Sequence, residues 1–97
     1  MPDTPPHPAP PAWRDDIDSL AFQPGGHEGM CVVHRLAFRT LLGIDATPQA
    51  CIDYFHAHQP AFDAAAMAKI ARRELPRDAN FHLNSRDIKR FAAVSMG

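Results

Sequence analysis

Apolar and polar positions alternate in two short runs near the start of the chain. In residues 19–23, Leu20 and Phe22 share one face of an extended chain, and the residues between them share the other. Residues 30–33 resume the pattern after a glycine-rich interruption. Because β-branched residues favour strands and glycine-rich segments favour turns, the two runs predict an antiparallel β-hairpin with residues 25–29 at its tip.

The apolar spacing then changes to that of a helix. Residues 35–42 carry apolar side chains at i, i+1, i+4 and i+5, and Gly43 suits the left-handed end of a helix. Thr47 followed by Pro48 is typical of a helix start. A second apolar stripe continues past Pro60, which we expect to kink or restart the helix without rotating the stripe. The stripe consists of Ile52, Phe55, Phe62, Ala66 and Ile70.

The end of the chain adds one more strand and a helix. We expect Pro76 to end the long helical segment, and residues 80–85 to form a third strand with Phe81 and Leu83 on one face. Ser85 is the predicted cap of a last short helix that ends near Ala92. The order ββααβ plus a short terminal helix predicts an α+β fold of two layers, in which a three-stranded, mostly antiparallel sheet carries helices on one face.

Proline dominates the beginning of the chain, where six of the ten prolines lie within residues 2–11. Proline removes a backbone donor and favours extended polyproline II. We therefore expect residues 1–12 to form a disordered arm. Residues 13–97 are expected to form one small domain, because a chain of 97 residues allows a single core.

The composition narrows the class of protein. Hydrophobic residues make up 45% and charged residues 22%, with a formal net charge of −1, which is unlike an acidic disordered polymer or a uniformly basic nucleic-acid binder. No apolar stretch approaches the roughly 20 residues that span a bilayer, and the N-terminus lacks the features of a secretory signal. We expect a cytoplasmic protein that does not enter a membrane, with Cys31 and Cys51 as free thiols.

Residues 25–34, GGHEGMCVVH, look like an incomplete zinc-protease motif. That motif requires a helix, whereas these glycines and valines favour a turn and a strand. On an extended chain His27 and Cys31 would lie about 13 Å apart, and Cys31 and His34 would point to opposite faces. We predict no metal, no cofactor and no catalytic residue here. The alternative, a small enzyme or metal-binding protein that uses Cys31 with a nearby histidine, would need a tertiary cluster of Cys31, Cys51, His34 and His58.

Charge is distributed unevenly along the chain. Residues 1–63 contain three basic and eight acidic residues, a net charge of −5, and residues 64–97 contain seven basic and three acidic residues, a net charge of +4. Six of the basic residues fall into two groups with i, i+3, i+4 spacing, so each group forms a stripe on one helix. The groups are Lys69, Arg72 and Arg73, and Arg86, Lys89 and Arg90.

The simplest interpretation is that these cations are solvated helix faces, partly neutralised by Glu74, Asp78 and Asp87. If the two helices are neighbours, however, the six cations form one surface that can hold phosphates or an acidic protein. The leading functional hypothesis is therefore a non-catalytic binding or regulatory module whose partner is nucleic acid or an acidic protein. Self-association through an exposed sheet edge is a further candidate.

Several short motifs follow one another in a recognisable order. They are Trp13, LAF at 20–22, Gly29, CVV at 31–33, AF at 37–38, Gly43, Phe55, AMAKI at 66–70 and LNSRD at 83–87. In this succession, which covers about residues 13–90, the chain resembles a family of small bacterial proteins called domain of unknown function 1488. The resemblance implies a two-layer α+β fold and no established activity. The sequence departs from the family at Pro60 and at His34, where Ser or Thr is frequent, so we expect a helix cap weaker by about 1 kcal/mol.

Overall fold

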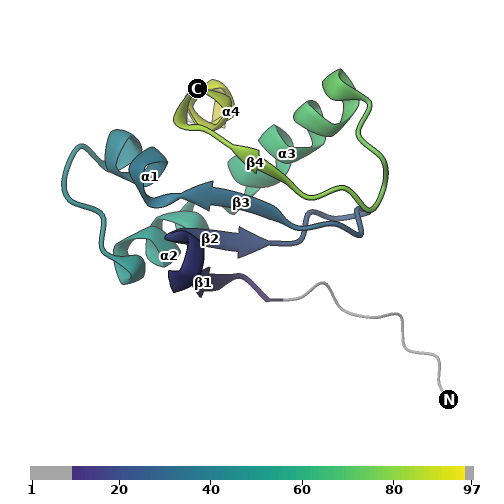
Figure 1. The fold of residues 1–97 in the computed structure, drawn as a ribbon. Helices are drawn as coiled ribbons and strands as arrows, with labels where there is room; N and C mark the ends of the chain where they lie inside the picture. Colours follow the sequence, from purple (N-terminus) through teal and green to yellow (C-terminus); the bar gives the residue numbers. More distant parts are fainter. Residues whose placement is uncertain (1–9, 96–97) are drawn as a thin grey trace, which may run out of the picture.

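The structure of the protein, a computed structural model, describes residues 10–95, with side chains described as far as Phe91. Within these residues, four strands, one 3-10 helix and four α-helices follow one another along the chain (Figure 1). Their order is β1 (Ala12–Arg14), η1 (Asp15–Ile17), β2 (Ser19–Phe22), β3 (Cys31–His34), α1 (Arg35–Leu42), α2 (Pro48–Ala57), α3 (Gln59–Arg73), β4 (Phe81–Leu83) and α4 (Ser85–Ser95).

The strands form one mixed sheet in the order β1-β2-β3-β4. The first two pairings are antiparallel, and β4 runs parallel to β3 after a connection through α1, α2 and α3. Trp13, Leu20, Val33 and Leu83 lie side by side across the sheet. The mixed α+β class and the β2–β3 hairpin are thus confirmed. The predicted order ββααβ with three strands is wrong in detail, because it lacks β1 and counts α2 and α3 as one helix.

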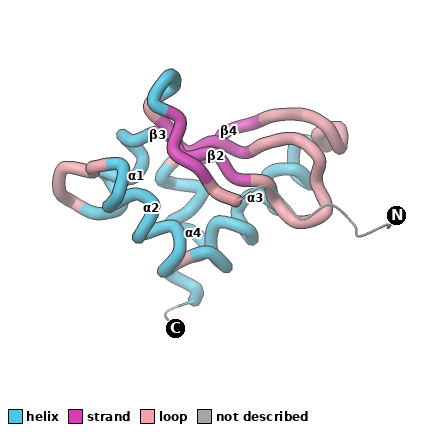
Figure 2. The backbone as a smooth tube through the Cα atoms, turned by 90° about the horizontal axis from the view of Figure 1, so that it is seen from below, coloured by secondary structure: helices cyan, strands magenta, loops and turns pink. Residues whose placement is uncertain are grey.

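All four α-helices cover the same face of the sheet (Figures 1 and 2). Side chains from the inner face of the sheet and from every α-helix meet in one core, in which the rings of Phe22 and Phe55 lie 4.9 Å apart and those of Phe38 and Phe62 lie 5.8 Å apart. The opposite face carries no α-helix among the described residues. The described part of the chain therefore forms two layers, and its α-helices leave the other face of the sheet open.

The strand that the sequence analysis missed is β1. Ala12, assigned above to the arm, is its first residue and directly follows Pro10 and Pro11, whereas residues 1–9 of the predicted arm lie outside the described part of the chain. Three residues are too few to show a period of two. The strand forms because η1 and Asp18, which adopts a left-handed conformation with φ of 51°, fold the chain back so that Trp13 pairs with Leu20.

Pro60 divides the long helical segment into α2 and α3. The residue lies in the first turn of α3, where a missing N–H leaves no helical hydrogen bond unmade. Pro60 therefore restarts the helix, and the stripe continues on the inner face, where Phe55, Phe62 and Ala66 are buried. The predicted start and end signals are confirmed. Thr47 Oγ1 accepts a hydrogen bond from Ala50 N at 3.1 Å, and Gly43 ends α1 with a φ of 75°.

One helix cap differs from the predictions, and a second shows how its side chain acts. Ser85 is the first residue of α4 rather than its cap, because Asn84 Oδ1 accepts from Asp87 N at 2.9 Å while Asp87 Oδ2 accepts from Asn84 N at 3.0 Å. This reciprocal pair satisfies two donors at the start of the helix. At α1, His34 Nδ1 accepts from Leu36 N at 3.1 Å, so the imidazole supplies a side-chain cap in the absence of Ser or Thr.

Candidate binding surfaces

Lys69 is buried, and the prediction that it forms part of an exposed basic stripe is wrong. Its residue surface is 7% exposed, because it lies on the inner side of α3 near Ala65 and Ala66. The ammonium group Nζ donates to Asp87 Oδ2 at 3.1 Å and to the backbone oxygen of His82 at 2.8 Å. Lys69 therefore joins α3 to β4 and α4 and cannot contact a partner.

Asp87 receives donors from three directions. Besides Lys69 Nζ and Asn84 N, the Arg72 guanidinium lies 3.8 Å from Asp87 Oδ1. Burial alone would raise the pKa of Asp87, but the hydrogen bonds from Asn84 and Lys69 and the charges of Lys69 and Arg72 together lower this pKa below its usual value. The carboxylate is therefore ionised at neutral pH and fixes the beginning of α4 against α3.

The other five predicted site residues are exposed. Arg72 and Arg73 lie in the last turn of α3, and α4, which packs along α3, carries the others. We call these five side chains the basic surface: Arg72, Arg73, Arg86, Lys89 and Arg90. The ion pair of Arg72 with Asp87 connects the two helices.

The pairing of Lys69 with Asp87 does not reduce the charge of this region. It removes one cation and one anion from residues 64–97, so the net charge of the remaining ionised side chains stays at +4. Arg77, which the sequence analysis left out of both stripes, is also exposed, and its Nε lies 4.0 Å from Glu28 Oε2. The C-terminal third of the chain therefore presents excess positive charge to the solvent.

The thiol alternative is not supported by the surroundings of the cysteines. Cys31 and Cys51 are both free and fully buried. Burial raises the pKa of the Cys31 thiol far above its usual value and that of Cys51 to about 11. Because the thiolate is the nucleophile and the metal ligand, neither residue has the properties of a reactive cysteine. Among the described residues, no group of three or more His, Cys, Asp or Glu side chains is placed to hold a metal ion.

The loop that resembles a zinc motif has a structural role. His27 is buried, its Nε2 lies 2.7 Å from the backbone oxygen of Ala79, and its ring packs edge-on against Phe81. Arg77 O accepts hydrogen bonds from the backbone of the same loop, and a Cβ on Gly29 would lie only 2.1 Å from Ala79 O. The predicted hairpin tip is thus packed tightly against the loop between α3 and β4.

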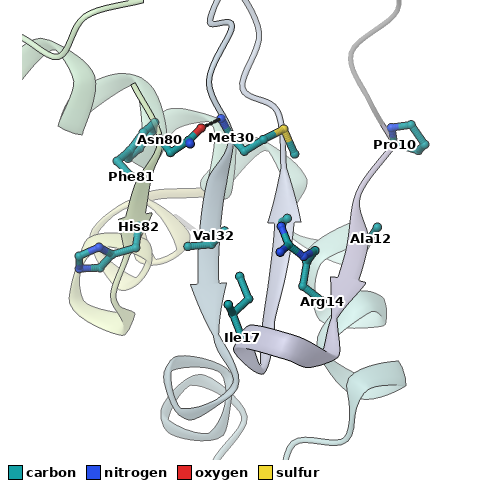
Figure 3. Close-up of a pocket in the computed structure, with 10 residues that line it drawn as sticks. Pro10, Ala12, Arg14, Ile17, Met30, Val32, Asn80, Phe81 and His82 are labelled. Atoms are coloured by element: carbon teal, nitrogen blue, oxygen red, sulfur yellow. Dashed lines mark hydrogen bonds between the residues drawn. The ribbon is translucent and has the colours of Figure 1, made fainter. Parts of the chain in front are cut away.

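The open face of the sheet contains a hollow that the sequence analysis did not identify. Its volume is about 530 Å³, and Figure 3 looks onto it. Alternation along the strands explains its composition, since residues that follow or precede the core positions point outward. The apolar lining includes Ala12, Ile17, Ala21, Met30 and Val32, and the polar side chains around it include Arg14, Asn80 and His82. Once β1 is recognised, the same alternation identifies this face from the sequence.

Comparisons with known proteins add no further information. No model of a known protein family matches the chain, and no significant match was found among curated proteins or solved structures. Within the described residues, none of the helices combines the length and apolarity that a membrane crossing requires.

Proposed function

We propose that the chain is a small non-catalytic binding module whose basic surface binds nucleic acid through its phosphates. The observation that supports this proposal is that five cations on α3 and α4 are exposed, while the one buried cation of the region, Lys69, already has a carboxylate partner. Only Arg72 among the five shares that carboxylate, at 3.8 Å. Lysine and arginine side chains in such a cluster attract phosphates without reading the base sequence.

The salt dependence of binding gives the proposal a numerical test. Each phosphate contact to duplex DNA contributes about 0.9 to the slope of log K against log salt concentration. Five contacts predict a slope of about −4.5, and a fourfold rise in salt should then weaken binding by about 500-fold. Arg86→Gln/Lys89→Gln/Arg90→Gln removes three contacts and should reduce the slope to about −1.8.

The experiment is a titration of a short fluorescent DNA duplex, followed by anisotropy, at 50 and 200 mM salt. Arg39→Gln is the matched control for Arg90→Gln, because each removes one exposed arginine from a helix and Arg39 lies outside the basic surface. We expect Arg90→Gln to weaken binding and Arg39→Gln to have little effect. Absence of binding at 50 mM salt would reject nucleic acid, and equal effects of the two variants would reject the basic surface as the site.

Other parts of the proposal concern origin and location. Two free buried cysteines agree with a reducing compartment, which supports a cytoplasmic location. The resemblance to domain of unknown function 1488 stays part of the proposal and assigns no activity. An acidic protein is the second candidate partner. This partner would be favoured if duplex DNA does not bind and an acidic protein binds the wild-type chain but not the triple variant.

A further inference from the structure

The two parallel strands end at the same edge of the sheet, and each continues directly into an α-helix. β3 and β4 lie side by side (Figure 1), with Val33 opposite Leu83. The next residues of the two strands, His34 and Asn84, supply the side-chain caps of α1 and α4. These two helices also contact each other. The beginnings of α1 and α4 therefore lie around one point of the surface.

A hollow of about 420 Å³ lies at this point, within the described part of the chain. Its volume falls in the range of about 300–1,000 Å³ that is typical of sites for small ligands. It shares only His82 with the hollow on the open sheet face. Leu36, a large apolar side chain that is 52% exposed, forms part of its wall. We call it the helix-start hollow, and its lining includes His34, Leu36, Ala37, His82, Asn84 and Ser85.

Two polar side chains at the helix-start hollow have a hydrogen-bond donor to offer. His34 Nδ1 accepts from Leu36 N at 3.1 Å, so the proton of the imidazole lies on Nε2. Asn84 Oδ1 accepts from Asp87 N at 2.9 Å, which leaves the amide nitrogen Nδ2 as a donor. Neither nitrogen has a hydrogen-bond partner among the described residues. The hollow can therefore donate to acceptor atoms of a ligand.

Carboxylates near the helix-start hollow are already paired. Asp18 Oδ2 lies 4.0 Å from His34 Nε2, which is beyond hydrogen-bond distance, and accepts from Arg35 Nε at 2.9 Å. Asp87 accepts from Lys69 Nζ at 3.1 Å. Neither carboxylate lines the hollow. An anionic partner can therefore approach the hollow without meeting an unpaired negative charge on its wall.

The basic surface begins beside this hollow. Ser85 lines the hollow, and Arg86 follows it directly in the chain. Lys89 comes four residues after Ser85, and side chains at i and i+4 lie on the same side of a helix, about 6 Å apart along its axis. Arg86 and Lys89 are both exposed. One nucleic-acid strand can therefore reach the cations of α4 and the hollow together.

We propose that the helix-start hollow takes one unpaired base of a nucleic acid whose phosphates lie on the basic surface. This inference rests on the proposed function and names the class of nucleic acid, a duplex with a single-stranded end. Exposed imidazole rings such as those of His34 and His82 can stack on a base, and the two donors can reach acceptors on its edge. A base inside a duplex must first leave the stack, whereas a base in an overhang is free to enter.

The test compares three DNAs that share one duplex, by anisotropy at 50 mM salt. One duplex is blunt, one carries a 3′ overhang of thymidines, and one carries an overhang of the same length made of abasic nucleotides. The two overhangs have the same phosphates, so their difference isolates the base. Because stacking one base on an aromatic ring commonly strengthens binding at least fivefold, we expect the thymidine overhang to bind about tenfold more tightly than the abasic one.

The outcomes separate this inference from the proposed function. Equal affinity for the thymidine and abasic overhangs would overturn the inference, while binding of the blunt duplex would leave the proposed function intact. Absence of binding to all three DNAs at 50 mM salt would overturn both.

A pair of variants locates the base at the hollow. Leu36→Glu places a carboxylate in the hollow and should reduce the tenfold preference for thymidine to about one. Ile44→Glu is the matched control, because Ile44 is 65% exposed, does not line the hollow, and its replacement changes the net charge equally. We expect Ile44→Glu to keep the preference. The same preference in both variants would overturn the inference.

His82→Ala is a second variant that leaves the fold contacts of this residue in place. Lys69 Nζ bonds to the backbone oxygen of His82, which alanine retains. Loss of the ring should reduce the preference for thymidine about threefold. His56→Ala is the control, because His56 is an exposed histidine of α2 that lies outside the hollow and the basic surface. If both histidine variants kept the full preference, the base would not contact the hollow.

Discussion

Replacing Lys69 by methionine tests whether this cation stabilises the fold, unlike the exposed cations that can bind a partner. Methionine keeps the length and much of the apolar volume of the lysine side chain but removes the ammonium group. In the structure this group donates to Asp87 and to the backbone oxygen of His82. Lys69→Met therefore leaves a largely buried carboxylate with fewer partners, and we expect a lower free energy of unfolding.

The size of the loss can be worked out from the contacts. The Lys69 and Asp87 side chains are only 9% and 12% exposed, so solvent screening is weak. Breaking a fully buried ion pair costs about 3–5 kcal/mol, and one hydrogen bond to a charged group contributes about 1.5–3 kcal/mol. Because Asp87 keeps Asn84 N and the nearby Arg72, we expect about 3 kcal/mol, at the lower end of the range.

The assay is urea unfolding followed by circular dichroism, with Lys89→Met as the control. Lys89 is an exposed lysine of α4, and its replacement should change the free energy of unfolding by at most about 0.5 kcal/mol. For a domain of this size, 3 kcal/mol corresponds to a fall in melting temperature of at least about 12 °C. If Lys69→Met and Lys89→Met were equally stable, Lys69 would be a surface residue and the assignment of its role would be wrong.

Three other predictions follow from the same contacts. The pKa of Asp87 is lower in the folded state than in the unfolded chain, where it is about 3.9. The stability that the ionised carboxylate contributes is therefore present above this unfolded pKa and is lost as pH falls through the lower folded pKa. The difference in unfolding free energy between wild type and Asp87→Asn should therefore shrink below about pH 4, and a difference that grows there would reverse this sign. Gly29→Ala should destabilise the fold by about 2 kcal/mol, because the new Cβ meets Ala79 O. Gly25→Ala is the control and should not destabilise the fold, because open space surrounds Gly25. Equal melting temperatures of the two variants would show that the loop around Gly29 can move away from the loop around Ala79. Cys31→Ser should cost about 1–3 kcal/mol by placing a hydroxyl in the core, and a thiol reagent at pH 8 should label the wild-type protein only after unfolding; rapid labelling of the native protein would contradict the burial.

Local chemistry was sufficient to predict part of the fold. Thr47, Pro48 and Gly43 act through hydrogen bonds and backbone angles that involve only a few neighbouring residues, and the structure confirms the helix boundaries they predict. The hairpin could be predicted for the same reason, since alternation in two short runs defines both strands. In contrast, β1 depends on the turn made by η1 and Asp18, and its three residues carry no periodic signal of their own.

The misplacement of Lys69 has a different cause. The spacing of Lys69, Arg72 and Arg73 shows that these residues share one side of a helix but does not show which side faces the core. Phe62 and Ala66 on the buried stripe lie seven and three residues before Lys69, so helical periodicity also places position 69 on the inner face. The sequence therefore contained a signal that position 69 is buried. The prediction followed the charge instead, because lysine is usually exposed. The partner Asp87, 18 residues away, could be identified only from the tertiary structure.

The buried cation and the exposed cations of this region can be distinguished, because substituting the first should lower stability and substituting the others should lower affinity. Lys69 and Asp87 hold the start of α4 against α3 and cover the edge of β4, so the geometry of the basic surface depends on them. A change at Lys69 should lower stability and should reduce nucleic-acid binding only to the extent that the chain unfolds. A change at Arg86, Lys89 or Arg90 removes an exposed charge, which contributes little to folding but one phosphate contact to binding. Stability and affinity measured on the same set of variants therefore assign each cation to the fold or to the surface, whichever anionic partner binds.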